Sequence, residues 1–101
     1  MKQLAVNKSY SISFDGEICD KQGKLLRNYK NADGYTTVCI KLPNGKNVTF
    51  GVHRLVALTY LPVDNPSQLV VNHKDLNKSN NSVSNLEWVS TKQNNIHHYL
   101  S

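Results

Sequence analysis

A chain of 101 residues can form one compact domain with a modest core, but it is too short to enclose a large organic cofactor in a deep cavity. Twelve lysines and arginines against seven acidic residues give a formal charge of +5, which favours polyanionic partners such as nucleic acid. No apolar run is long enough to cross a membrane, and the amino terminus lacks the apolar region of a signal peptide. The sequence therefore predicts a soluble, cytoplasmic protein.

The two cysteines, Cys19 and Cys39, lie inside strand-like runs and form no C-x-x-C pair, which argues against a zinc knuckle or ribbon. A disulfide between them stays open as an alternative. Free thiols in a reducing compartment are the favoured interpretation.

Residues 9–51 have a pattern typical of β-structure. In SYSISF, Tyr10, Ile12 and Phe14 alternate with serines and predict a strand, which the pair Asp15-Gly16 turns into the next one. A second turn, DKQGK, leads to a further apolar pair at residues 25–26. We expect these segments to pair as antiparallel strands.

The clearest hairpin is GYTTVCIKLPNGKNVTFGV, which runs from Gly34 to Val52. Apolar residues alternate on both sides of its turn, at Val38, Ile40 and Leu42 and then at Val48, Phe50 and Val52. The pair Asn44-Gly45 is expected to supply the positive φ angles of a tight turn.

After residue 51 the apolar period becomes helical. VHRLVALTYLP predicts a helix that Pro62 closes. A short strand, 69–72, a polar loop and a second strand, 86–89, follow, with Leu86 and Trp88 both expected to face the core. Ser90 and Gln93 form an S-x-x-Q capping box, which predicts a helix from about residue 91. The carboxyl-terminal unit is thus strand, loop, strand, helix.

A helix laid across this hairpin would face His73 at the end of the first strand. Asn94 and His97 are three residues apart and Asn94 and His98 four apart, so each pair shares a helix face. Histidine titrates near neutral pH and can deprotonate water, and amide oxygens are suited to Mg²⁺ or Mn²⁺. Imidazole and amide oxygens that converge in a basic protein indicate metal-assisted hydrolysis of phosphodiesters.

Three segments in order, VHRLVALTYLP, VNHKDLNKSNNSVSNLEW and STKQNNIHHY, resemble the HNH endonucleases, in the branch typical of phages and mobile elements. The resemblance implies an α+β fold, with a β-rich antiparallel sheet over residues 1–51 followed by a ββα-metal (His-Me finger) nuclease unit over 52–101. It also implies cleavage of double-stranded DNA, with 5′-phosphate and 3′-hydroxyl products, by a monomer or homodimer.

By position, the resemblance makes His73 the general base and Asn85 the residue that braces the loop and orients this base. It makes Asn72 and Asn94 the ligands of Mg²⁺ or Mn²⁺. His97 would touch phosphate or support the metal, and helical geometry permits His98 equally. Where this chain has Asn72, relatives can have Asp, which predicts a weaker metal site. Asp75 is expected to cap or close the loop, with compensation for the missing charged ligand as the alternative.

Several basic residues are candidate DNA contacts, with a solvated surface charge as the alternative for each. Their positions are Arg54, Lys41, Lys46, Lys74 and Lys78. A basic, Asn- and Thr-rich sheet could enter the major groove. His53 is expected to pack or cap rather than to act in catalysis.

Two further functions compete with the nuclease. A catalytically weak or inactive HNH-fold module could bind DNA through its basic sheet, which the neutral Asn72 favours. A structural role in a phage particle is the third, and a strong salt dependence of DNA binding would argue against it.

Overall fold

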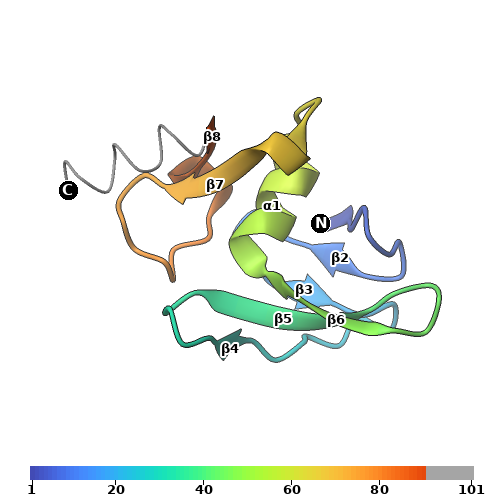
Figure 1. The fold of residues 1–101 in the computed structure, drawn as a ribbon. Helices are drawn as coiled ribbons and strands as arrows, with labels where there is room; N and C mark the ends of the chain where they lie inside the picture. Colours follow the sequence, from blue (N-terminus) through green and yellow to red (C-terminus); the bar gives the residue numbers. More distant parts are fainter. Residues whose placement is uncertain (91–101) are drawn as a thin grey trace.

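The computed structural model describes residues 1–90, which form an α+β fold in which α1 lies among three small antiparallel sheets (Figure 1). The first sheet contains β1 (Lys2–Gln3), β2 (Ser11–Ile12) and β3 (Ile18–Cys19). The second contains β4 (Tyr29–Lys30), β5 (Thr36–Lys41) and β6 (Asn47–Gly51), and the third contains β7 (Leu69–His73) and β8 (Leu86–Ser90). Helix α1 (Val52–Tyr60) follows β6, and the 3-10 turns η1 (Pro66–Gln68) and η2 (Val83–Asn85) precede β7 and β8.

The hairpin predicted from alternation is confirmed as β5 and β6. Val38 pairs with Phe50 and Ile40 with Val48, so the apolar residues of both strands lie on one face. The expected turn conformation is wrong in one respect. Only Gly45 has a positive φ, of 86°, and Asn44 instead accepts a hydrogen bond from the Lys46 amide through its side chain. The chain therefore reverses through a longer turn that needs one left-handed residue, rather than through a two-residue turn that needs two.

The strand expected over Tyr10, Ile12 and Phe14 is shorter than predicted. β2 ends at Ile12, because the Ser13 hydroxyl and carbonyl accept hydrogen bonds from Glu17 and Gly16 and close a turn. Phe14 lies in this turn with 62% of its surface exposed, and its ring packs on Tyr60 at 4.5 Å between centroids. Alternation thus placed Phe14 on a strand that a local serine turn had already ended.

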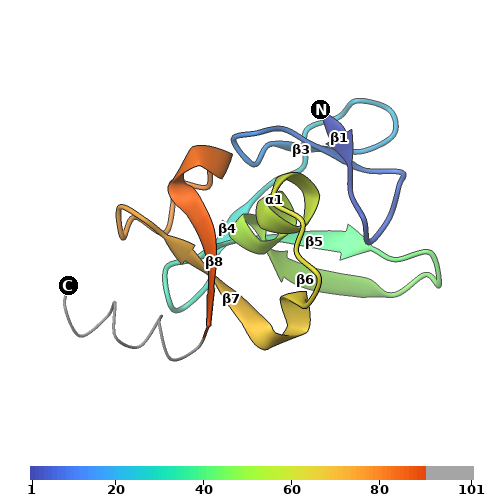
Figure 2. The ribbon, with the colours of Figure 1, turned by 90° about the horizontal axis from the view of Figure 1, so that it is seen from above.

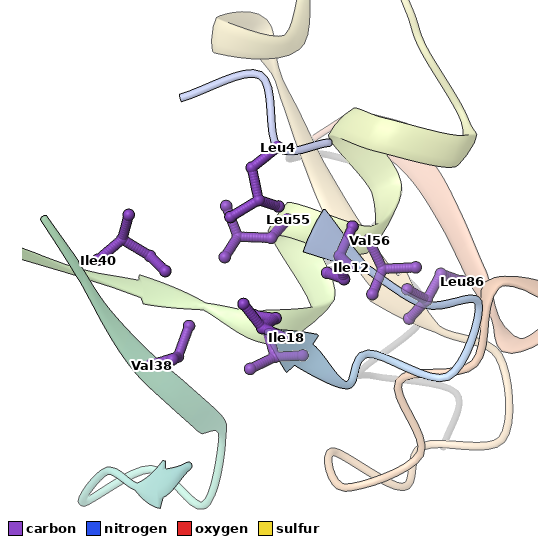
Figure 3. Close-up of a cluster of buried hydrophobic side chains, with 9 residues drawn as sticks. Leu4, Ile12, Ile18, Val38, Ile40, Leu55, Val56 and Leu86 are labelled. Carbon is purple, nitrogen blue, oxygen red and sulfur yellow. The ribbon is translucent and has the colours of Figure 1, made fainter. Parts of the chain in front are cut away.

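Helix α1 is confirmed, and it lies at the centre of the molecule in both views (Figures 1 and 2). It contacts strands from all three sheets. The buried apolar side chains gather around it (Figure 3) and come from both predicted segments, 1–51 and 52–101. They are Leu4, Ile12, Ile18, Val38, Ile40, Val52, Leu55, Val56 and Leu86. The two segments therefore share one hydrophobic core.

The strands predicted near the carboxyl terminus are confirmed as β7 and β8. Leu86 is buried as expected, whereas Trp88 is only half-buried and donates its indole N–H to the Leu61 carbonyl at 2.6 Å. Cys19 and Cys39 are free thiols. The helix predicted from residue 91 lies outside the described residues. No helix within residues 1–90 has the length and hydropathy that a membrane span requires.

Candidate functional site

The candidate site is built on the β7–β8 hairpin and the polar loop of residues 74–82. β7 and β8 pair from Leu69 opposite Ser90 to His73 opposite Leu86, so His73 lies at the end of the ladder where the connecting loop begins. The Lys74 amide donates to the Asn85 carbonyl at 2.8 Å and continues the pairing by one step. A regular antiparallel ladder therefore fixes the backbone of His73, and the loop starts directly after it.

The His73 side chain is buried, with 5% of its surface exposed, and it is held by a residue that the sequence did not single out. Its Nε2 lies 2.8 Å from Oδ1 of Asn81, which is itself 6% exposed. The sequence has five asparagines between residues 70 and 88, and no spacing distinguishes Asn81 from the others. Only the path of the loop brings Asn81 back against the imidazole.

Asn85 braces the loop instead of contacting the imidazole. Its side-chain oxygen accepts from the Asp75 amide at 3.1 Å, and its side-chain nitrogen donates to the Asp75 carboxylate and to the Asn80 carbonyl, both at 2.9 Å. The Asp75 carboxylate also accepts from the Asn77 amide and the Asn80 side chain. These bonds from Asn80, Asn77 and Asn85 lower the pKa of Asp75. Asp75 thus closes the loop, as expected.

Two further connections fasten this loop to the amino-terminal sheets. The Lys78 ammonium donates to the Asp33 carbonyl at 2.7 Å and lies over the Tyr35 ring. At the other end of the loop, the Ser82 hydroxyl donates to the Asp15 carboxylate at 2.8 Å, and the Val83 amide donates to the Phe14 carbonyl. The turns before β5 and β3 therefore both support the loop that carries the site.

His53 also belongs to the site. Its ring lies 5.1 Å from the His73 ring and stacks on Tyr35 at 5.0 Å between centroids. The ring also covers Gly51, because a Cβ on that glycine would lie 2.7 Å from the imidazole. Burial, the nearby His73 and then Arg54 lower the pKa of His53 to about 4. His53 therefore packs, as expected, and it stays uncharged beside His73 at neutral pH.

Asn72 lies opposite Glu87 in the ladder, and its side-chain nitrogen donates to the Glu87 carboxylate at 3.0 Å. That bond does not use the amide oxygen of Asn72, the atom that a metal would bind. Amide and carboxylate oxygens are the donors that Mg²⁺ and Mn²⁺ accept, so this pair fits such an ion. Within residues 1–90, no three His, Cys, Asp or Glu side chains converge as a metal site. The sequence did not single out Glu87, since the strand register was needed to find it.

The basic candidates divide into two groups. Lys41, Lys46 and Lys74 are exposed. The Arg54 guanidinium donates to the Pro66 carbonyl at 3.3 Å and lies over the Trp88 ring, while Lys78 makes the bond to Asp33 described above. The first group is thus open to a ligand, whereas the second already holds parts of the protein together.

Three predicted site residues lie outside the described part of the chain. They are Asn94, His97 and His98. The structure therefore places the predicted base, one predicted ligand and the bracing asparagine in one hairpin, and the helix-borne predictions stay predictions.

Comparisons with known proteins identify the family and the fold. The HNH endonuclease family model matches residues 50–96. The chain is 45% identical over 97 residues to the uncharacterized HNH endonuclease L245 of Acanthamoeba polyphaga mimivirus, an alignment that covers 94% of this chain and 28% of L245. It is 43% identical over 86 residues to the DNA endonuclease I-HmuI of Bacillus phage SP01, covering 84% of this chain and 48% of I-HmuI.

A solved structure, described as "DNA binding and cleavage by the HNH homing endonuclease I-HmuI", superposes with a TM-score of 0.84 at 38% identity. The superposition covers 97% of this chain and 56% of that chain. The chain spans between about a quarter and a half of the length of these curated relatives. The matched motifs and the shared fold lead to one conclusion: the chain belongs to the HNH endonuclease family.

Proposed function

We propose that the protein is a divalent-metal-dependent DNA endonuclease in which His73 is the general base. The observation that supports this most directly is the buried contact of 2.8 Å between His73 and Asn81, at the end of β7, in a chain of the HNH endonuclease family. The names of the relatives support DNA as the substrate, since I-HmuI is called a DNA endonuclease.

The contact with Asn81 determines which nitrogen of His73 can act. The amide oxygen of Asn81 only accepts hydrogen bonds, so Nε2 of a neutral His73 carries the proton and Nδ1 carries the lone pair. Nδ1 is then the atom that takes a proton from the attacking water. Asn81 keeps the imidazole in this tautomer and orientation, and the uncharged His53 adds no positive charge beside it.

The Asn72–Glu87 pair is the place in the described residues where a divalent ion fits. The amide oxygen of Asn72 and the carboxylate of Glu87 would hold it, with Asn94 as the further ligand that the family resemblance implies. Such an ion would stabilise the charge that grows on the leaving 3′ oxygen. Glu87 would supply the negative charge that Asn72 lacks, so this proposed site would not consist of neutral ligands alone.

DNA would contact the exposed lysines near the site and along the second sheet. Lys41 lies on the outer face of β5, where Cys39 and Thr49 are also exposed, and Lys46 lies in the adjoining turn. Lys74 follows the base directly. A monomer with one His73 would nick one strand, and a homodimer could cut both.

The test is the conversion of supercoiled plasmid to open circle or linear DNA with Mg²⁺ or Mn²⁺, with EDTA as a control. We expect metal-dependent cleavage by the wild type. His73→Ala should lower the rate by about 100-fold or more, because general-base catalysis contributes 10²–10⁴. It should leave DNA affinity in EDTA unchanged, since no phosphate-contacting charge is removed.

Other outcomes separate the alternatives. A wild type that shifts plasmid at low salt but cleaves it in neither metal would replace the nuclease with a DNA-binding module. Cleavage that survives His73→Ala would exclude His73 as the base. For the lysines, the double variant Lys41→Ala/Lys46→Ala should reduce the slope of log affinity against log salt by about two. The double variant Lys21→Ala/Lys24→Ala removes the same charge and is the control, in which the slope should change less.

A further inference from the structure

Leu76 combines two features that are unfavourable in a polar loop. It is 48% exposed, and its φ is 65°, the one positive φ outside glycine in residues 1–90. A left-handed backbone is strained for a branched, bulky side chain, and glycine or asparagine adopts it at much lower cost. An exposed leucine alone is ordinary. Glycine or asparagine at this position would remove both the backbone strain and the exposed apolar surface. A leucine that keeps both unfavourable features therefore indicates a function.

Packing within residues 1–90 does not account for Leu76. It belongs neither to the buried core nor to the partly buried apolar residues that pack against that core. Hydrogen bonds of its neighbours keep the strained conformation in place. The Asp75 carboxylate accepts from the Asn77 amide, and the Asn85 side chain bonds to both the amide and the carboxylate of Asp75. Hydrogen bonds therefore hold the loop in a conformation in which, among the described residues, Leu76 is exposed.

The position of Leu76 relative to His73 suggests what covers this side chain. The Leu76 amide donates to the His73 carbonyl at 3.0 Å, so the two residues are the ends of a four-residue turn. Their Cα atoms are then separated by less than about 7 Å. Measured along the axis of a DNA duplex, that distance corresponds to roughly two base steps. A duplex whose scissile phosphate lies at His73 would therefore pass close to Leu76, and the exposed Lys74 lies between these two residues in the sequence.

The geometry points to Leu76 as an apolar wedge that packs into the groove of duplex DNA beside the scissile phosphate. This inference rests on the proposed function. Apolar side chains inserted between base steps are an established way in which proteins grip and bend DNA. Leu76 would position the phosphate against His73 through contact with bases or sugars, while Lys74 supplies the sequence-independent attraction.

The test compares Leu76→Asn with Leu76→Met in binding to a fluorescein-labelled, mixed-sequence duplex in EDTA. Asn suits a positive φ and removes the apolar contact, whereas Met keeps an apolar side chain. We expect Leu76→Asn to bind about fivefold more weakly. The wild type would bury the exposed half of the Leu76 side chain against DNA, and the variant has no such apolar surface to bury. Leu76→Met should bind within about twofold of the wild type on the same scale.

Two further readouts distinguish a wedge from a structural role. The Tm of Leu76→Asn should be no lower than that of the wild type, since the strain is relieved. Its salt slope should stay unchanged, whereas Lys74→Ala should reduce the slope by about one. A central mismatch, which is easier to unstack, should tighten binding of the wild type more than that of Leu76→Asn.

Each outcome is decisive. Wild-type affinity for Leu76→Asn on both duplexes would overturn the wedge, as would a Tm several degrees below that of the wild type, which would show that Leu76 packs for stability. Wild-type protein that neither binds nor cleaves DNA would instead refute the proposed function on which the wedge rests.

Discussion

Acid should weaken this fold through His53, and His53→Phe should remove that sensitivity. The His53 ring packs against Tyr35, His73 and the backbone of Gly51, which has no Cβ in the way. Protonation would place a charge at this packed position beside His73 and Arg54, which explains why the pKa of His53 falls to about 4. Phenylalanine keeps the aromatic stack and cannot titrate.

The sign follows from proton uptake. In the unfolded chain His53 has its ordinary pKa of 6.5, and in the folded protein its pKa is about 4. Between these values the unfolded state binds a proton that the folded state does not, so the free energy of unfolding falls as the pH falls from 6.5 to 4. The loss approaches about 3 kcal/mol at pH 4 and then levels off. That is a large part of the 5–15 kcal/mol typical of a small domain.

The assay is urea unfolding of the wild type and His53→Phe at pH 7, 5.5 and 4. The pKa of Asp75 is lowered in the folded state, so protonation of Asp75 also lowers the free energy of unfolding in acid. This contribution is the same in both proteins. The difference between the two proteins therefore isolates His53. We expect the wild type to lose about 2–3 kcal/mol more than His53→Phe between pH 7 and pH 4. Equal losses in the two proteins would refute the argument that His53 is held uncharged.

Three other changes test the site. Asn81→Ala should lower DNA cleavage by about 100-fold without changing DNA affinity in EDTA, because the tautomer and orientation of His73 are lost; Asn80→Ala is the neighbouring control, and equal rates for the two would contradict the role of Asn81. Asn85→Ala should lower the free energy of unfolding by about 3 kcal/mol, measured in urea, since three side-chain hydrogen bonds disappear. Glu87→Gln, which preserves shape and the bond to Asn72, should weaken Mn²⁺ binding by about 10-fold in calorimetry; an unchanged Kd would remove Glu87 from the metal site.

Local patterns determined the elements and the family. The alternation of Val38, Ile40, Val48 and Phe50 was enough to predict β5 and β6, and the helical period after residue 51 was enough to predict α1. Both signals act within one element, where side-chain direction follows from backbone geometry. The same local reading failed at Phe14, because the Ser13 hydroxyl and backbone ended the strand before the alternation did.

The order of residues along the chain was also enough to select His73, Asn72 and Asn85, since the HNH motif is read from the sequence. The sequence alone could not select Asn81 among its neighbours, pair Glu87 with Asn72, or bring His53 against His73. Those contacts depend on the register of β7 with β8 and on the way the loop folds back onto helix α1 and the turn before β5. Sequence patterns thus determined which residues belong to the nuclease motif, whereas only the tertiary structure decided which side chains support the imidazole, because those partners meet through long-range packing that has no local period.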